Sequence, residues 1–252
     1  MRTKRLKELV DNPELIPSIY NYCDRWCERC LFTARCAVFT MEQTESGSGS
    51  PSRDAKNEAF WRQLEETLQT ALELLTEIAQ ETGVDLDALV SEEDKVSWIR
   101  LQKEAREDAL FRQAEGYMRR VRRWFESVDV ETRLGLLAVD SKPDVEGIED
   151  IGKVILWYHM LICAKITRAV QHEIGERPAF LEDMPKDSDG SAKVALIAID
   201  RSMAAWWRMR GYFPQRKDQI VDFLMRLERL RIATERAFTK ARSFIRPGFD
   251  EE

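Results

Sequence analysis

The chain has 252 residues, of which 44% are hydrophobic and 33% are charged, and its formal net charge is −6. This is the composition of an ordinary soluble protein with enough residues for one sizeable core, or for one large domain with a small appendage. The longest apolar run, 154–164, is too short to cross a bilayer, and the segment after Met1 lacks the apolar core of a secretory signal. We therefore expect a cytoplasmic protein with reduced cysteines and no membrane partner.

The first feature of interest is a run of four cysteines. The whole chain contains only five. Cys23, Cys27, Cys30 and Cys36 follow the spacing C-x3-C-x2-C-x5-C, and thiolates two or three residues apart can converge on one ion or cluster. Structural zinc sites usually divide their ligands into two knuckles separated by about a dozen residues or more. The single local run therefore favours a [4Fe-4S] cluster, with zinc as the alternative cofactor. Two disulfides are the remaining alternative, and a reducing cytosol argues against them.

One local resemblance supports this interpretation of the cysteines, and a second is set aside. The run Cys27-x2-Cys30-x5-Cys36 resembles the last three ligands of the iron-sulfur loop in endonuclease III-type DNA glycosylases, whose first ligand lies further upstream. The resemblance covers under a tenth of the chain and implies a [4Fe-4S] cluster, not glycosylase activity, because no helix-hairpin-helix segment or catalytic Lys/Asp pair accompanies it. The spacing Cys23-x3-Cys27-x2-Cys30 is similar to the radical S-adenosylmethionine triad. Cys36 would fill the iron that those enzymes leave open, and no strand-helix alternation follows.

The residues between the cysteines fit an anionic centre. Four thiolates carry more negative charge than a metal core cancels, and Arg25, Arg29 and Arg35 lie where they offset it. Trp26, with other aromatic residues nearby, provides an apolar shell that controls water access. We expect Arg25, Trp26, Arg29 and Arg35 to surround the metal ligands.

After the cysteines, the sequence predicts a linker and then only helices. Residues 42–57 are polar and rich in Gly and Ser, which is typical of a flexible tether. Apolar residues then recur at intervals of three and four, which predicts helices at 58–80, 91–127, 130–139, 145–174, 191–210 and 216–244. We therefore expect an all-α protein with a cysteine-rich metal-binding module at 1–41, a linker at 42–57 and a helical bundle of about five long helices at 58–252. The 145–174 helix is apolar on all sides, which predicts a central, buried position.

Three ionisable residues fall on apolar helix faces and form a candidate pocket. A helical wheel places His159 and Glu173 in the stripe of the 145–174 helix and Arg231 in that of the last helix. A pocket would use His159 as an acid or base and Arg231 to bind a carboxylate or phosphate. In the alternative, these residues have only a structural role. His159 is then buried with a hydrogen bond to a neighbouring hydroxyl, and Glu173 forms an ion pair with Arg231. Cys163 is predicted to be a small buried residue.

The C-terminal fifth of the chain is basic. Residues 201–246 contain twelve Lys and Arg against four acids, which indicates either a nucleic-acid surface or arginines paired with acids elsewhere in the fold. Trp206 and Trp207 are expected to continue an apolar face into the core, with base stacking as the alternative.

Together these features predict a metal-centred binding protein or a sensor of redox state or iron, with an unidentified protein or redox partner. Four protein ligands leave no open metal position, which favours electron transfer, sensing or structure over Lewis-acid catalysis. The alternatives are a redox enzyme with a pocket near His159 and Arg231, and a zinc-knuckle nucleic-acid-binding protein that uses the basic C-terminal region.

Overall fold

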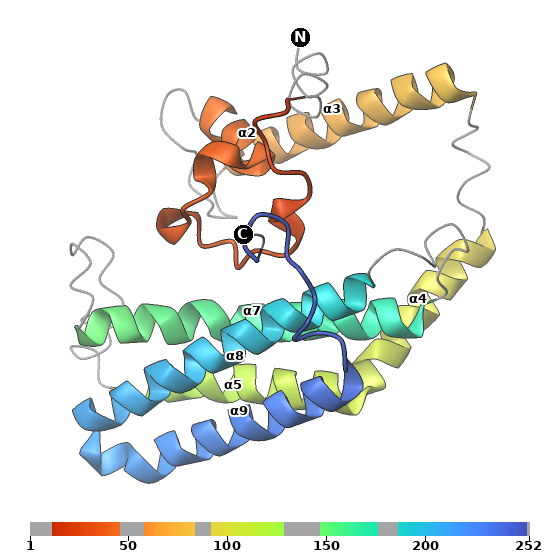
Figure 1. The fold of residues 1–252 in the computed structure, drawn as a ribbon. Coiled ribbons are helices and arrows are strands. Elements are labelled where there is room, and N and C mark those ends of the chain that lie inside the picture. The colour runs from red at the N-terminus through yellow and green to blue at the C-terminus, as the bar shows by residue number, and fades with distance from the viewer. Residues whose placement is uncertain (1–11, 46–57, 84–91, 129–146, 176–185, 251–252) are drawn as a thin grey trace. The chain divides into compact units, whose positions relative to one another are not determined.

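The computed structural model describes residues 12–45, 58–83, 92–128, 147–175 and 186–250 (Figure 1). Across these ranges the regular elements are seven α-helices and four short 3-10 helices, with no strand. The prediction of an all-α fold is therefore confirmed. The helix expected at 130–139 lies outside the described residues. Within the same ranges, no helix combines the length and the apolar character that a membrane crossing requires.

The chain divides into two compact units. One contains residues 1–98 together with 246–252, and the other contains residues 99–245. The first unit includes the cysteine segment, α2 (Ala37–Glu45) and α3 (Glu58–Thr82). Helix α2 takes in the first residues of the segment expected as a linker at 42–57, and the rest of that segment lies outside the described residues. The predicted domain boundaries stay predictions.

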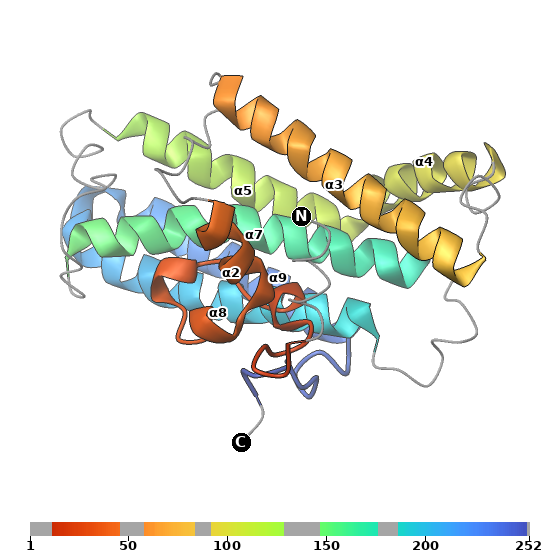
Figure 2. The same ribbon diagram turned by 90° about the horizontal axis from the view of Figure 1, so that it is seen from above.

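The second unit is built on four long helices around one core. These are α5 (Ala109–Ser127), α7 (Ile148–Ile174), α8 (Asp187–Tyr212) and α9 (Lys217–Ala237). Both α7 and α9 pack against α5 and against α8, so the four helices close a ring (Figures 1 and 2). The side chains inside the ring are fully buried and mostly aliphatic, which makes the hydrophobic effect its main stabilising force: Val121, Ile155, Ile162, Ile166, Leu196, Ile199, Ile220 and Leu227.

An aromatic cluster ties three of these helices together. The Trp206 ring of α8 stacks on Phe223 of α9 with centroids 4.3 Å apart, and its indole N–H donates to the Tyr117 hydroxyl of α5 at 3.0 Å. Trp206 is therefore a core residue, as expected. Trp207 was expected in the core as well, but it is 58% exposed with Arg210 stacked on it at 4.0 Å. Consecutive helical residues project about 100° apart, so both indoles do not share one face.

Several helices differ from the sequence prediction: α8 begins at Asp187 in place of 191, and α9 ends at Ala237 in place of 244. The helix expected at 91–127 is divided into α4 (Glu92–Glu107) and α5 at Asp108, whose carboxylate accepts the Leu110 N–H at 2.7 Å as an N-cap. The periodicity continues across this break, so the pattern alone did not reveal it. Helix α7 was predicted to be buried on all sides, but Met160 is 51% exposed. Its buried side packs against α5 and α8, while its apolar outer side remains at the surface.

Candidate metal centre

The cysteine segment consists of short 3-10 turns followed by α2. The turns are η1 (Ile19–Asn21), η2 (Cys27–Arg29) and η3 (Thr33–Arg35). Residues three apart in a 3-10 turn eclipse each other, because the turn repeats about every three residues. Cys27 opens η2, and the backbone N–H of Cys30 donates to the Cys27 carbonyl at 3.1 Å. The x2 spacing of these two cysteines therefore corresponds to one complete turn.

All four clustered cysteines line one cavity. Cys23, Cys27, Cys30 and Cys36 contribute to its wall, together with apolar side chains that include Ile19, Trp26 and Phe39. Its free space is about 20 Å³, roughly the room that one water molecule needs. The backbone thus collects four thiols from fourteen consecutive positions around a common space.

The thiols in this cavity are reduced and do not form a compact single-ion site. All five cysteines are free, so the disulfide alternative has no support. Among the described residues, no group of three or more His, Cys, Asp or Glu side chains is arranged to hold a metal ion. A zinc ion with four thiolates about 2.3 Å away would need sulfur atoms about 3.8 Å apart. The four cysteines line one cavity, and the described residues contain no such ready-made cage.

The environment of Cys27 favours its protonated thiol. Burial raises the pKa of Cys27 above its usual value, and Glu42, Cys23, Glu28 and Cys36 raise it further. Two hydrogen bonds orient neighbouring sulfur atoms: the Phe32 N–H donates to Cys30 Sγ at 3.4 Å, and Cys23 Sγ donates to the Tyr20 carbonyl at 3.5 Å. Metal binding by Cys27 would therefore release a proton and be favoured as the pH rises.

The residues predicted to surround the metal ligands take different positions. Arg25 and Trp26 line the cavity, and Arg25 adopts a positive φ of 58°. The Arg29 guanidinium stacks on the Trp26 ring at 3.9 Å, and Arg29 does not itself line the cavity. Arg35 Nε donates to the Glu14 carbonyl at 3.3 Å, which fastens the preceding chain to η3. Arg25 is thus the arginine of this set that lines the cavity itself.

The cavity is also lined by a residue that lies far from the cysteines in the sequence. Phe249, from the C-terminal segment of the same compact unit, lines the cavity. The segment closes on itself because Arg246 forms a two-pronged ion pair with Asp250, with Nη2–Oδ1 at 2.9 Å and Nε–Oδ2 at 3.0 Å. Gly248 has a φ of +73°, and a Cβ there would lie 2.7 Å from Ile16 Cδ1. The signal that could have found it is Pro247-Gly248 before an aromatic residue, a turn that presents a ring.

The candidate pocket residues of the helical region each have local partners. His159 is 4% exposed, its Nδ1 lies 2.7 Å from the Leu156 carbonyl, and burial lowers its pKa. Glu173 was expected on a buried face but lies at the surface, where it accepts from Lys186 Nζ at 3.1 Å and Ser188 Oγ at 2.9 Å. Arg231 forms a two-pronged pair with Glu228 at 2.7 and 2.9 Å. This pair raises the pKa of Arg231 and lowers that of Glu228.

Several arginines of the basic C-terminal region are paired with acids. Arg226 binds Asp222 at 2.7 Å, and Arg242 connects Asp200 of α8 to Glu235 of α9 at 2.8 and 2.9 Å. Arg231 and Arg246 are paired in the same way. These contacts favour the structural explanation of the basic composition over a nucleic-acid surface. Cys163 is buried as expected, and burial raises the pKa of its thiol.

Comparison with models of protein families, with curated proteins and with solved structures finds no match to this chain.

Proposed function

We propose that Cys23, Cys27, Cys30 and Cys36 hold a [4Fe-4S] cluster and that the protein acts through it as a redox-responsive or iron-responsive binding protein. The observation that carries this proposal is the shared cavity, which four thiols from one short run line together. A four-iron cube is wider than a single ion, so its thiolates stand further apart than those on zinc. This agrees with thiols that face one space without a tight single-ion cage among the described residues.

The surroundings supply features that an iron-sulfur protein uses to set its potential. The Phe32 N–H points to Cys30 Sγ, and hydrogen bonds to cluster sulfur favour the reduced state. Arg25 brings positive charge to the cavity wall, while Ile19, Phe39 and Phe249 limit access of water. Four protein ligands leave no iron open for a substrate. Sensing or electron transfer therefore follows more directly from this ligand set than catalysis at the metal does.

The proposal is tested by purifying the protein without oxygen and measuring its visible absorption, iron, acid-labile sulfide and zinc. A brown protein with about four irons and four sulfides per chain is expected. The Cys163→Ser variant is the matched control, because Cys163 lies in the bundle helix α7 and does not line the cavity. Protein that contains neither iron nor zinc and retains all its thiols would contradict a metal centre.

Zinc is the second candidate, and the size of the cavity favours it. The free space of about 20 Å³ suits a single ion better than a cube, so a cluster requires the loop from Cys23 to Cys36 to move outward. Colourless protein with one zinc per chain would select this candidate and reject the cluster. If the site binds zinc, the metal would have a structural role, and the folding of the cysteine module would depend on it.

A further inference from the structure

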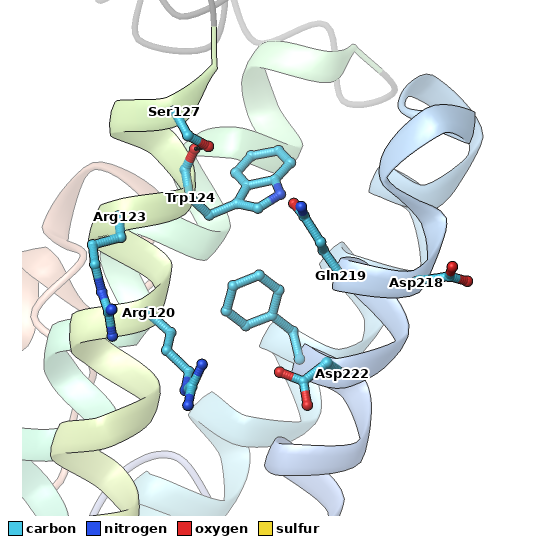
Figure 3. Close-up of a pocket in the computed structure, with 8 residues that line it drawn as sticks. Arg120, Arg123, Trp124, Ser127, Asp218, Gln219 and Asp222 are labelled. Atoms are coloured by element: carbon cyan, nitrogen blue, oxygen red, sulfur yellow. Dashed lines mark hydrogen bonds between the residues drawn. The ribbon is translucent and has the colours of Figure 1, made fainter.

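A second pocket lies in the other compact unit, between the C-terminal half of α5 and the first turns of α9 (Figure 3). Its volume is about 470 Å³, within the range of sites that bind small molecules. Helix α5 contributes Arg120, Arg123 and Trp124 to its wall, and α9 contributes Asp218, Gln219 and Asp222. One wall is therefore basic and the opposite wall is acidic, with an indole between them.

The aromatic part of this pocket is rigid. Trp124 and Phe223 both line it, and they are only 4% and 5% exposed. Phe223 stacks on Trp206 at 4.3 Å, and Trp124 meets the edge of the same ring at 5.1 Å. The two lining rings are thus held by a third ring that belongs to the core, so a ligand would meet a preformed apolar surface.

One buried donor in this pocket has no acceptor. The indole Nε1–H of Trp124 is buried and makes no hydrogen bond. Most buried donors are paired, because burying an unpaired polar group is unfavourable. Figure 3 shows the indole nitrogen on the side of the ring that faces Gln219, and no hydrogen bond joins the two. A ligand oxygen that reaches this position would satisfy the donor.

Two charged residues of the pocket have no partner among the described residues, whereas Asp222 is paired with Arg226 at 2.7 Å. Neither Arg120 nor Asp218 makes a hydrogen bond or ion pair with any residue in the described ranges. Figure 3 shows Arg120 and Asp222 turned toward each other from opposite walls. By contrast Arg119, on the same turn of α5, is paired with Glu115 at 2.8 Å. The helix dipole explains basic residues at the end of α5, but it does not explain why Arg120 faces a pocket without a partner.

We propose that this pocket binds a small zwitterionic organic molecule with a flat apolar body. A carboxylate would bind the planar guanidinium of Arg120 and accept from Trp124 Nε1–H, because guanidinium donors match carboxylate geometry. An ammonium group would bind Asp222 on the opposite wall through Oδ1, because Oδ2 already accepts from Arg226 Nε at 2.7 Å. The apolar body would lie against Trp124 and Phe223. The site is independent of the cysteine cavity, and it requires no metal.

The test uses three probes of one shape with the full-length protein. 4-(Aminomethyl)benzoate carries both charges, 4-methylbenzoate carries only the anion, and 4-methylbenzylamine carries only the cation. Binding is followed through the indole N–H resonance of Trp124, assigned by triple-resonance NMR, and through calorimetry. The zwitterion is expected to bind at least about tenfold more tightly than either singly charged probe, because it makes one more charge-assisted interaction. It is also expected to shift the Trp124 resonance.

Matched variants locate the two ends of the ligand. Arg120→Gln is expected to lower the affinity for the zwitterion and for 4-methylbenzoate about tenfold or more. The affinity for 4-methylbenzylamine should not change. Asp222→Asn should weaken binding of the zwitterion and of 4-methylbenzylamine. Asp218→Asn should leave both unchanged, because the Asp218 carboxylate is turned away from the pocket in Figure 3. Arg119→Gln is the control, since Arg119 does not line the pocket. Equal binding of all three probes, equal effects of the two arginine variants, or an unchanged Trp124 resonance at about 10 mM zwitterion would each overturn the proposal.

Discussion

Phe249 lies edge-to-face against Phe32, with ring centroids 5.0 Å apart and planes at 76°. More than two hundred residues separate the two in the sequence. Phe32 follows Cys30 and Leu31 in the cysteine segment, and Phe249 lines the cysteine cavity. Aromatic pairs in this geometry contribute about 0.5–1.5 kcal/mol beyond the burial of their surface. The C-terminal segment is therefore a structural part of the cysteine module. Substitutions in this segment should change the stability of the module.

Gly248→Ala is expected to destabilise the cysteine module by about 1–3 kcal/mol. The positive φ of 73° disfavours any residue with a Cβ, and that Cβ would lie 2.7 Å from Ile16 Cδ1. Hydrogen exchange of residues 12–45 measures the effect. Faster exchange there, with unchanged exchange in α7 and α8, is the expected result.

Gly116→Ala is the control for Gly248→Ala, and its expected effect on stability has the opposite sign. Gly116 lies inside α5, and a Cβ there would meet nothing within 4 Å. Alanine should therefore stabilise the helical unit by about 0.5–1 kcal/mol through its helix propensity. Urea denaturation of both variants compares them. Equal effects of the two substitutions would show that the backbone strain at Gly248 is unimportant.

Replacing any one of Cys23, Cys27, Cys30 or Cys36 by serine should remove most of the bound metal. Each variant lacks one thiolate of the proposed ligand set, and metal binding also stabilises the fold of such a module. Metal content per chain and thermal stability measure the loss. Cys163→Ser should retain the wild-type metal content. A serine variant at one of the four positions with full metal content would remove that residue from the ligand set.

His159 should make the helical unit less stable in acid. Burial lowers the pKa of His159 below its usual 6.5, so the folded protein keeps the ring neutral while the unfolded chain takes up a proton. The free energy of unfolding should therefore fall as the pH drops below 6.5 toward the lowered pKa, by up to about 1.4 kcal/mol per pH unit. His159→Gln should reduce this slope in denaturation experiments between pH 7 and about pH 5. His172→Gln, in a half-exposed position, should retain it.

Tyr117→Phe should destabilise the bundle by about 1–3 kcal/mol at neutral pH, because it leaves the buried Trp206 N–H without its acceptor. Burial also raises the pKa of Tyr117 above its ordinary value of 10.0. Above pH 10 the unfolded wild-type chain loses this proton while the folded protein keeps it, so wild-type stability falls. The difference between wild type and variant should therefore shrink with rising pH. Tyr212→Phe, at a ring 48% exposed, should stay within about 0.5 kcal/mol of wild type.

The helices could be predicted from the sequence because their apolar residues recur with the helical period. Ile155, Ile162 and Ile166 follow that period and are fully buried in α7. The break at Asp108 escaped prediction because an N-cap within a continuous apolar pattern looks like any other polar helix residue. The exposure of Trp207 shows the same limit, since it was expected to continue an apolar helix face into the core and helix geometry turns it outward.

The candidate site was predictable only in its local part. Spacing alone placed the four cysteines within reach of one another, because one 3-10 turn connects Cys27 to Cys30. Pro247-Gly248 indicates a turn that presents the Phe249 ring, but no local pattern reports that this ring contacts a segment more than two hundred residues away. The pairing of Arg231 with Glu228, in place of Glu173, depends on side-chain reach along one helix. The pocket between α5 and α9 depends on which helices become neighbours, which the sequence pattern does not specify.

The contribution of Phe249 to the cavity has a consequence for the order of events during translation. Residues 12–45 leave the ribosome roughly two hundred residues before Phe249 does, an interval of about 10–40 s at ordinary synthesis rates. During that interval the four thiols exist without the ring that later covers one side of their cavity. A metal centre of the kind proposed would assemble on this segment either before or after Phe249 closes one side of the cavity, and the two orders differ in how exposed the thiols are.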